Sequence, residues 1–364
     1  MNVAAIVVNY RTAEAAIDSV KALLVELDKL GDSRVVVVDN ESGDGSLERL
    51  VEAARVHGWG PRVVVIPSGH NGGYGYGINV GAQEAMSWPT APRYLYIINP
   101  DATPLPGAID RLVRFMDENP SVGLTGSTVH NDDGSFVSAF RFPSLLSEFE
   151  SNANLGIFSR LLDKHRVALK PPGQTVEVDW VPGTSMLIRN PTFAEIGRFD
   201  EDFFLYFEEI DLCRRIRDAG YEVYFVEGAG VKHIGSLATG MGDESKRMPG
   251  YWFSARRRYF VKHHGRLYAA ACDAAMLGGH VLRKAADRVL SRQSNARPHF
   301  GRDLLRYALA HVAAPAPLSA APHSAQRREV QAKPHSAERN WVEAKPHSAE
   351  RSEVEAKPDR RAEN

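Results

Sequence analysis

Short apolar runs rich in Val and Ile alternate with helical patterns in the N-terminal part of the sequence, and this order restricts the fold more than any other feature. The runs cover residues 4–8, 34–38 and 62–66, and helical spacing covers residues 12–30 and 46–57 between them. Runs without polar alternation are typical of strands that are buried on both faces of a parallel sheet. The βαβαβ order therefore predicts an α/β fold, with a mainly parallel central sheet flanked by helices.

The alternation continues beyond this unit and then weakens. A glycine-rich segment, a helix over 77–86, a strand over 94–98 and a helix over 106–118 come next. The following part of the chain predicts a mixed α+β arrangement, in which a helix over about 209–219 is ended by Gly220. Its expected strands are shorter and cover residues 123–130, 135–140, 177–188 and 222–226.

The C-terminal tail contains a repeat of 12 residues that starts at Pro322, Pro334 and Pro346, with a further proline at 358. Each unit carries a proline, mixed charge and little apolar content, so it has too few apolar side chains to build a core. Repeats that stack into folded arrays are usually longer than about 20 residues. We therefore expect a disordered tail, with a folded array as the alternative.

Charge is distributed unevenly along the chain. Residues 1–255 hold 23 Lys and Arg against 34 Asp and Glu, whereas residues 256–306 hold 12 against 3. The basic part starts with three arginines and continues into helical stretches such as 267–290, where apolar and basic residues mix. We expect amphipathic helices here that contact an anionic membrane surface, with a solvated basic helix as the alternative and no nucleic-acid partner.

The composition of the 364 residues fits a globular protein of a reducing compartment. The hydrophobic share of 43% and charged share of 24% exclude wholesale disorder. Two cysteines, Cys213 and Cys272, are too few for a disulfide scaffold. The first apolar run is too short for a secretory signal, and no run reaches the length of a membrane span. We expect a cytoplasmic protein, with peripheral attachment to the inner face of the plasma membrane.

Polar side chains follow the predicted parallel strands at the edge where such sheets bind ligands. Asn9 and Tyr10 follow the first strand, Asp39 the second and Asn71 the third. A carboxylate at the position of Asp39 accepts hydrogen bonds from a ribose or a pyrimidine imide, although an acidic turn residue is an equal alternative. The loop around Asn71 lets the backbone approach a ligand closely, although it has no dinucleotide or P-loop fingerprint.

Two further segments carry candidate chemistry. Asn99 and Asp101 follow the strand over 94–98, where a carboxylate suits a divalent cation that bridges diphosphate oxygens, although a simple turn is the alternative. The segment FFLYFEEIDLCRR places Glu208, Glu209 and Asp211 at the start of a helix behind apolar residues. These carboxylates either cap the helix or supply a general base beside a partly dry pocket.

Taken together and in this order, the motifs resemble the inverting family 2 glycosyltransferases of the GT-A fold, and especially the bacterial rhamnosyltransferase-like branch that builds cell-surface polysaccharides. The resemblance covers about residues 3–265. It rests on VVNY, VVDN, NGGYGYGIN, NPDA, WVPGTSMLIRN, FDEDFFLYFEEIDLCRRIRDAGY and VKHIGS. It implies a GT-A (Rossmann-like) architecture and metal-dependent transfer of a sugar to a hydroxyl of a cell-surface glycan or lipid-linked acceptor.

We expect four parts of the chain, the first two from the resemblance and the last two from charge and composition. Residues 1–125 are the nucleotide-sugar-binding half of a GT-A domain, and residues 126–255 are its acceptor-binding and catalytic half. Residues 256–312 are the basic amphipathic helical segment, and residues 313–364 are the disordered repeat tail. The oligomeric state is open.

Roles of single residues are carried over from the family at the matching positions. Asp39 binds the base or ribose of a nucleotide diphosphate sugar, with Asn9, Tyr10 and Asn71 nearby. Asn99 and Asp101 stand at the site of the family's DXD motif. Asp101 ligates Mg²⁺ or Mn²⁺ there, and His233 of VKHIGS adds a ligand. An amide replaces the first carboxylate of the motif at Asn99.

The remaining roles concern the acceptor and the base. Glu209 takes the place of the family's proposed general base, usually an aspartate, and Glu208 or Asp211 shares or takes that role. The acceptor is bordered by four residues: Trp180, Gly183, Thr184 and Arg141. By resemblance the donor is dTDP-rhamnose, with UDP and GDP sugars open.

Two other functions remain open from the sequence. A sugar-phosphate nucleotidyltransferase shares the α/β start and the metal, but carries a basic glycine-rich phosphate loop that NYRTAEAA does not supply. A non-catalytic scaffold with this fold binds glycans or partners without using Glu209.

Overall fold

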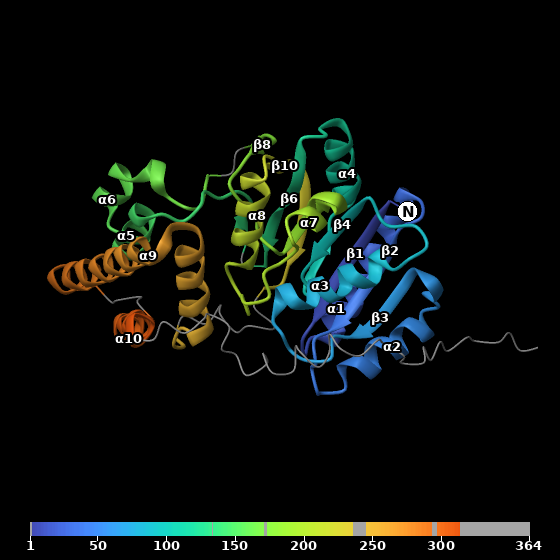
Figure 1. The fold of residues 1–364 in the computed structure, drawn as a ribbon, viewed down its shortest axis with the longest axis horizontal. Helices are drawn as coiled ribbons and strands as arrows, with labels where there is room; N and C mark the ends of the chain where they lie inside the picture. The colour runs from blue at the N-terminus through green and yellow to red at the C-terminus, as the bar shows by residue number, and fades with distance from the viewer. Residues whose placement is uncertain (1, 133, 171–172, 236–244, 293–296, 314–364) are drawn as a thin grey trace, which may run out of the picture. The chain divides into compact units, whose positions relative to one another are not determined.

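The computed structural model describes residues 2–132, 134–170, 173–235, 245–292 and 297–313, all within one unit, Met1–Leu318. Its centre is a ten-stranded sheet (Figure 1). The strand order is β3(Val63–Pro67), β2(Arg34–Asp39), β1(Val3–Asn9), β4(Tyr94–Ile98), β9(Ser185–Arg189), β6(Val122–Asn131), β10(Glu222–His233) and β5(Ala102–Pro104). β7(Phe136–Val137) pairs with β6, and β8(Val176–Glu177) pairs with β10. The repeats predicted to be disordered lie outside the described residues.

The first four strands of this order run parallel, as their apolar sequences predict. Residues of β1 alternate between two cores, with Val3, Ala5 and Val7 in one and the intervening residues in the other. Both faces of the strand are therefore buried, which explains why its sequence lacks a polar alternation. The α/β class with a parallel central part is confirmed.

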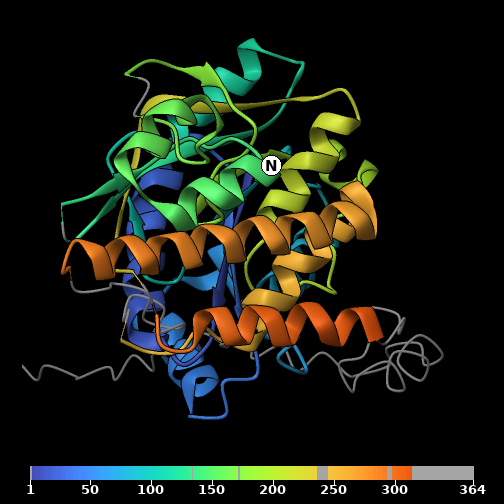
Figure 2. The same cartoon turned by 90° about the vertical axis from the view of Figure 1, so that its left-hand side faces the viewer.

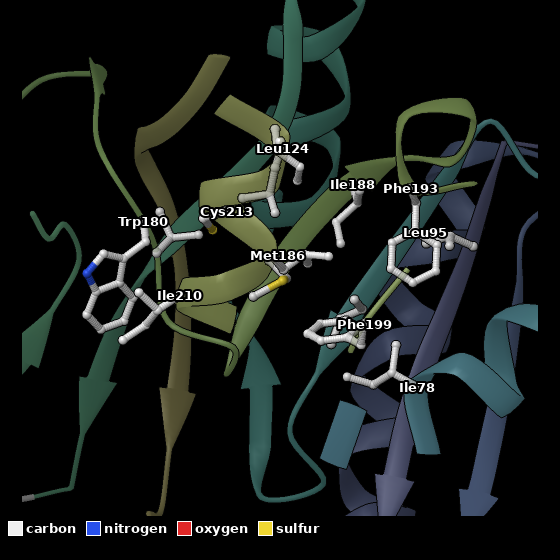
Figure 3. Close-up of a cluster of buried hydrophobic side chains, with 14 of the residues drawn as sticks. Ile78, Leu95, Leu124, Trp180, Met186, Ile188, Phe193, Phe199, Ile210 and Cys213 are labelled. Atoms are coloured by element: carbon white, nitrogen blue, oxygen red, sulfur yellow. The ribbon is translucent and has the colours of Figure 1, made fainter. Parts of the chain in front are cut away.

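Helices cover both faces of the sheet. The core on one face is shared by α1(Ala13–Leu27), α2(Ser46–Val56) and α4(Ala108–Glu118). The other face is covered by α3(Tyr74–Met86), α7(Asn190–Glu195), α8(Glu208–Asp218) and the start of α9(Gly250–Val289). Figure 3 shows this second core, where Ile78 of α3, Leu95 of β4, Met186 of β9 and Cys213 of α8 meet.

The second half of the sheet departs from the expected pattern. β9 enters antiparallel between β4 and β6, and the strand expected over 177–188 is regular only at its two ends. Of the strand expected over 135–140, Phe136–Val137 forms a strand, and Phe140 makes isolated bridges to Ala168 and Trp180. The boundary expected after residue 125 falls inside β6, because both halves contribute strands to one sheet. This arrangement leaves residues 178–184 as an irregular segment that leads to the edge of β4.

The C-terminal helices start earlier than predicted. α9 begins at Gly250 and bends at Gly265, whose φ of 85° interrupts the helix and divides it into residues 250–264 and 266–289 (Figure 2). The second part packs on α5(Leu145–Ala153), and α10(Phe300–Ala313) packs on α9. A short helix, α6(Gly156–Leu161), follows α5. No helix in the described ranges is long and apolar enough to cross a membrane.

The first arginines of the basic part are internal, so these residues of the segment expected to contact a membrane do not face outward. Arg256 is 1% exposed and forms ion pairs with Glu148 at 2.7 Å and Asp273 at 2.6 Å. Arg257 also pairs with Asp273. Because an unpaired buried charge is costly, these arginines require the acidic partners around them. The acidic body and the basic helix are parts of one folded unit.

A glycine-rich loop packs against the segment that precedes α8. The backbone N–H of Tyr74 donates to the carbonyl of Phe204 at 3.0 Å. Gly73 has a φ of +94°, and a Cβ atom built on it lies 2.0 Å from that same carbonyl oxygen. Only glycine meets both conditions, since other residues rarely adopt this backbone and the carbonyl oxygen of Phe204 cannot move without the main chain that carries it. The contact fixes the loop of β3 and α3 against the start of α8.

We predict that Gly73→Ala destabilises the protein by about 3 kcal/mol or more, because backbone strain and overpacking act together. Gly69→Ala is the matched control, since Gly69 lies in the same loop with a φ of +86° and a Cβ atom added there would meet no other atom within 4 Å. Its cost is limited to the backbone, about 1–2 kcal/mol. Urea unfolding of both variants measures the difference, and equal losses contradict the packing contact.

Candidate active site

The carboxyl ends of β1 and β2 hold a buried polar network. Asn9 and Asp39 are in register, and Asn9 Nδ2 donates to Asp39 Oδ1 at 2.8 Å. The Ser42 hydroxyl donates to the same oxygen at 2.6 Å, and its backbone N–H donates to Asp39 Oδ2 at 3.1 Å. Asn9 is fully buried and Asp39 is 4% exposed. Asn9 therefore orients the carboxylate rather than facing a ligand, and Ser42 is a member that the sequence reasoning missed.

Asn71 belongs to an adjacent network that shapes the glycine-rich loop. Its Oδ1 accepts from Asn40 Nδ2 at 3.1 Å and from the backbone N–H of Gly73 at 3.2 Å. Asn40 follows Asp39 directly, so this loop and the end of β2 are held together. Tyr10 lies at the same edge, where the Arg11 guanidinium is 5.1 Å from its ring centre.

Asp101 and His233 lie side by side because of strand register. β5 and β10 pair antiparallel, with Ala102 opposite His233. This register places Asp101 Oδ1 at 3.2 Å from His233 Nε2. The other ring nitrogen, Nδ1, is 3.3 Å from Asn131 Oδ1, which fixes the ring. Both side chains are largely buried, with exposures of 7% for Asp101 and 15% for His233.

The Asp101 and His233 pair fits a shared divalent cation. Two neighbouring ligands at about 2.1 Å from an octahedral ion are about 3.0 Å apart, close to the separation seen here. Within the described ranges no group of three or more His, Cys, Asp or Glu side chains is placed so that it could hold a metal ion. Two protein ligands suit Mg²⁺ or Mn²⁺, because these ions commonly complete their shell with substrate phosphates and water.

Asn99 adjoins this pair but presents its nitrogen to it. Its Nδ2 is 3.4 Å from His233 Nε2 and 3.4 Å from Thr184 Oγ1, and its backbone N–H donates to the Thr184 carbonyl at 3.1 Å. Ligation by the Asn99 oxygen therefore requires the amide to turn over. In this conformation Asn99 connects the Asp101 and His233 pair to the irregular segment before β9.

Two buried carboxyl groups begin α8. Tyr206 and Phe207 precede them with positive φ values of 69° and 67°, a backbone that bulky residues rarely adopt and that often marks functional sites. The Oε2 atoms of Glu208 and Glu209 are buried, and neither has a hydrogen-bond partner within the described part of the chain. Burial raises the pKa of Glu209 to about 7. Burial and the charge of Glu209 raise the pKa of Glu208 well above its usual range.

Tyr74 links the glutamates to Asp101, and the sequence reasoning did not single it out. Its hydroxyl donates to the Gly183 carbonyl at 3.1 Å. Burial raises the pKa of Tyr74, and the negative charges of Glu208, Glu209 and Asp101 raise it further. The phenol therefore lies in the field of both carboxylate groups. Its only signal in the sequence is an aromatic residue within the glycine-rich NGGYGYG loop.

A continuous path of contacts joins the two chemical groups. A Cβ atom built on Gly183 lies 3.7 Å from Glu209 Cβ and 3.6 Å from Tyr74 Cε1. Thr184 comes next in the chain and contacts Asn99, which contacts His233. The predicted residues Gly183, Thr184, Asn99, Asp101, His233 and Glu209 are thus brought together. Asn99 and Asp101 follow β4, Gly183 and Thr184 precede β9, His233 ends β10, and Glu209 lies in the first turn of α8.

Asp211 lies in a different environment from the glutamates. It is fully buried and is surrounded by Arg215 at 2.8 Å, Lys262 at 2.6 Å and His263 at 2.8 Å. Burial raises its pKa, but the hydrogen bond from His263 and the cationic partners outweigh burial and lower the pKa to about 2. Asp211 is therefore a fixed anion that holds α8 to α9, which does not suit the expected share in the role of base.

Trp180 and Arg141 form a separate group. The Trp180 ring stacks on Phe140 at 4.1 Å, and its Nε1 donates to the Arg141 carbonyl at 2.9 Å. The Arg141 guanidinium donates to the carbonyl of Arg166 at 3.2 Å. Because Trp180 is only 9% exposed, little of its indole faces solvent. These two residues support the segment that leads to Gly183, rather than adjoining Asp101.

We predict that Glu209→Gln raises the melting temperature at pH 8 but not at pH 4. A carboxyl group whose pKa is higher in the folded than in the unfolded protein lowers the stability of the native state as the pH rises. The loss extends from the unfolded pKa near 4.5 to the folded pKa near 7. The stabilisation at pH 8 is on the order of 3 kcal/mol. Thermal melts across this pH range test it, with the exposed Glu118→Gln as control. A gap to wild type that does not change with pH contradicts the burial of this carboxyl.

Comparison with known proteins identifies the family. The model of the family described as Glycosyl transferase family 2 matches residues 5–165. N-acetylglucosaminyl-diphospho-decaprenol L-rhamnosyltransferase of Mycobacterium tuberculosis (strain ATCC 25618 / H37Rv) is 31% identical over 216 residues, which are 57% of this chain and 68% of that enzyme. Rhamnosyltransferase WbbL of Escherichia coli (strain K12) is 28% identical over 162 residues, 43% of this chain and 59% of that protein.

A solved structure shares the fold. GalNAc-T7, solved with UDP, GalNAc and Mn²⁺, superposes with a TM-score of 0.54 at 14% sequence identity. The match covers 87% of this chain and 58% of that chain, and it confirms the GT-A fold. The sequence relatives extend this result from fold to family. This chain belongs to glycosyltransferase family 2, in its rhamnosyltransferase branch, and is a glycosyltransferase.

Proposed function

We propose that the protein transfers rhamnose from dTDP-rhamnose to a hydroxyl of a lipid-linked saccharide, with inversion at the anomeric carbon. The observation that carries the proposal is the path of contacts from Asp101 and His233 through Thr184 and Gly183 to Glu209. The sugar and the acceptor class are supported by the relative named for rhamnosyl transfer to a diphospho-decaprenol-linked sugar. A second neighbour, solved with UDP and Mn²⁺, supports a nucleotide donor and a divalent metal.

The donor site has two ends in this proposal. At one end Asp39 accepts hydrogen bonds from the nucleoside, with its carboxylate held in place by Asn9 and Ser42. At the other end Asp101 and His233 would hold Mg²⁺ or Mn²⁺, which neutralises charge on the diphosphate when it is bound. Because Asp101 and His233 are largely buried and fixed by neighbours, they change little on binding.

Glu209 is the base in this proposal. It removes the proton of the acceptor hydroxyl, the acceptor oxygen bonds to the anomeric carbon, and the bond from that carbon to the diphosphate oxygen breaks. The products are a glycoside of inverted configuration, a nucleoside diphosphate and a protonated Glu209. A pKa near 7 suits this role, because the carboxylate is both ionised at neutral pH and basic enough to take the proton.

Glu209 suits the role better than its neighbours for geometric reasons. Its Cβ adjoins Gly183, the point where the path of contacts reaches α8. Glu208 is 4% exposed, and burial together with the charge of Glu209 raises its pKa well above its usual range. Two other functions were left open by the sequence, a nucleotidyltransferase and a non-catalytic scaffold, and membership of a glycosyltransferase family disfavours both.

We predict that Asp101→Asn removes the metal-dependent part of nucleotide binding. In wild type, dTDP with Mn²⁺ raises the melting temperature more than dTDP alone, because a bound ligand stabilises by mass action. The variant loses this extra shift and at least about 100-fold of its activity, the usual effect of removing charge stabilisation of this kind. Asp18→Asn, at an exposed site on α1, is the control. An unchanged Mn²⁺ effect in Asp101→Asn contradicts the proposed site.

We predict that Glu209→Gln lowers kcat by a factor of about 100 to 10,000 while dTDP binding changes little. The base must be deprotonated, so wild-type kcat rises with pH to a plateau, with its midpoint near the pKa of about 7. Steady-state rates of dTDP release between pH 5 and 9 measure both effects. A variant that keeps the wild-type rate would exclude Glu209 as the base.

A further inference from the structure

The outward faces of the second part of α9 and of α10 are apolar and basic. In residues 266–289 the exposed positions recur at helical spacing and form one stripe along the helix. The stripe consists of Leu267, Ala270, Ala274, Val281, Ala285 and Val289. Leu267 is 89% exposed and Val289 is 83% exposed, the two highest values among the exposed large hydrophobic residues of the described chain. At 24 residues this part of α9 is about 36 Å long.

α10 presents a similar face. Leu305 and Leu309 are exposed by 47% and 58%, and Arg302 and Arg306 lie on the same side at helical spacing. The opposite side of α10 packs on α9, where Tyr307 stacks on Phe253 with ring centres 5.3 Å apart. Figure 2 shows α10 and the second part of α9 running side by side across the molecule.

Charge on these helices is sorted by sign. All three acidic residues of 266–310 are buried and paired: Asp273 with Arg256, Asp287 with Arg283, and Asp303 with Arg247. The exposed charges are all basic: Arg266, Lys284, Arg288, Arg292, Arg302 and Arg306. None of these six forms an ion pair with another described residue. The surface therefore combines exposed apolar side chains with uncompensated positive charge.

We infer that this surface, defined by the stripe of α9, by Lys284 and Arg288 of α9 and by Leu305, Leu309, Arg302 and Arg306 of α10, docks on a membrane that contains anionic lipid. Apolar side chains enter the headgroup boundary and basic side chains bind lipid phosphates when both lie on one side of a helix. A second copy of the chain fits less well, because a symmetric contact brings the same arginines together. The inference deepens the proposed function, since a lipid-linked acceptor is presented at such a surface.

The burial of the first arginines limits the inferred membrane contact to the later part of the basic segment. Arg256 and Arg258 are paired with Glu148 and Asp200 of the body, and Arg257 is paired with Asp273 of α9, so these arginines are not available to lipid. The kink at Gly265 separates this internal part from the outward stripe. The membrane contact therefore depends on residues after 265, and variants there leave the ion pairs around Asp211 intact.

Sedimentation of the full chain with phosphatidylcholine vesicles containing about 30% phosphatidylglycerol tests the surface. Wild type is expected to bind these vesicles at low salt. It is expected to bind little to vesicles of pure phosphatidylcholine, and little to the anionic vesicles in 0.5 M NaCl. The triple variant Lys284→Gln, Arg288→Gln, Arg306→Gln is expected to lose affinity on the order of 100-fold. The triple variant Leu267→Gln, Val281→Gln, Val289→Gln is expected to lose about tenfold or more.

A matched control removes three exposed valines elsewhere: Val25→Gln, Val51→Gln and Val56→Gln, exposed by 62%, 50% and 62% in wild type. It should bind as wild type does. Equal binding of anionic vesicles by the apolar variant and by wild type overturns the inference. The shift of the melting temperature by dTDP and Mn²⁺ is measured on the same variants. Because this shift needs no membrane, it distinguishes a failure of the membrane inference from a failure of the proposed donor site.

Discussion

The pairing of β9 with β4 is the contact on which the site depends. It brings residues before β9 to the carboxyl end of β4, where the backbone of Asn99 bonds to Thr184. Asp101 and His233 lie on one side of this contact, and Glu209 lies on the other. Without this antiparallel strand the parallel half and the mixed half would each hold only part of the chemistry.

Charge pairing makes α9 part of the catalytic unit. Lys262 and His263 bind Asp211, and Arg258 binds Asp200, so α9 fixes both ends of the segment that carries the glutamates. These contacts place cations beside Asp211 and none beside Glu208 or Glu209, whose pKa values are raised. One helix thus carries a permanent anion and a group that titrates near neutral pH, because their surroundings differ.

The sequence was most informative where a position follows from the end of an apolar run. Asp39, Asn99 and Asp101 could be located in this way, since parallel strands end at a common edge. Glu209 was one of three candidate carboxylates at a predicted helix start, and its choice as the base rested on the family resemblance. The ligand role of His233 rested mainly on the same resemblance, because the register of β10 is a tertiary feature. The roles of Ser42 and Tyr74 were missed, as each is defined by a contact with a distant segment.

The basic block shows a different limit of sequence reasoning. Summed charge indicated one cationic segment, but charge alone cannot tell buried arginines from exposed ones. Arg256 has acidic partners that come from α5 and from the far side of the Gly265 kink, so its burial could not be read from its neighbours in sequence. The outward apolar stripe of α9 could not be predicted residue by residue either, because its exposed residues alternate in sequence with buried apolar ones.

The proposed mechanism requires Asp101 and His233 to hold a divalent cation together beside the donor diphosphate. Pulsed electron paramagnetic resonance of Mn²⁺, bound to the protein together with dTDP, tests this ligand pair. We expect a nitrogen hyperfine signal from a coordinated imidazole that disappears in His233→Gln and persists in His57→Gln. Bound Mn²⁺ with no nitrogen signal in wild type, or with the same signal in His233→Gln, would contradict it.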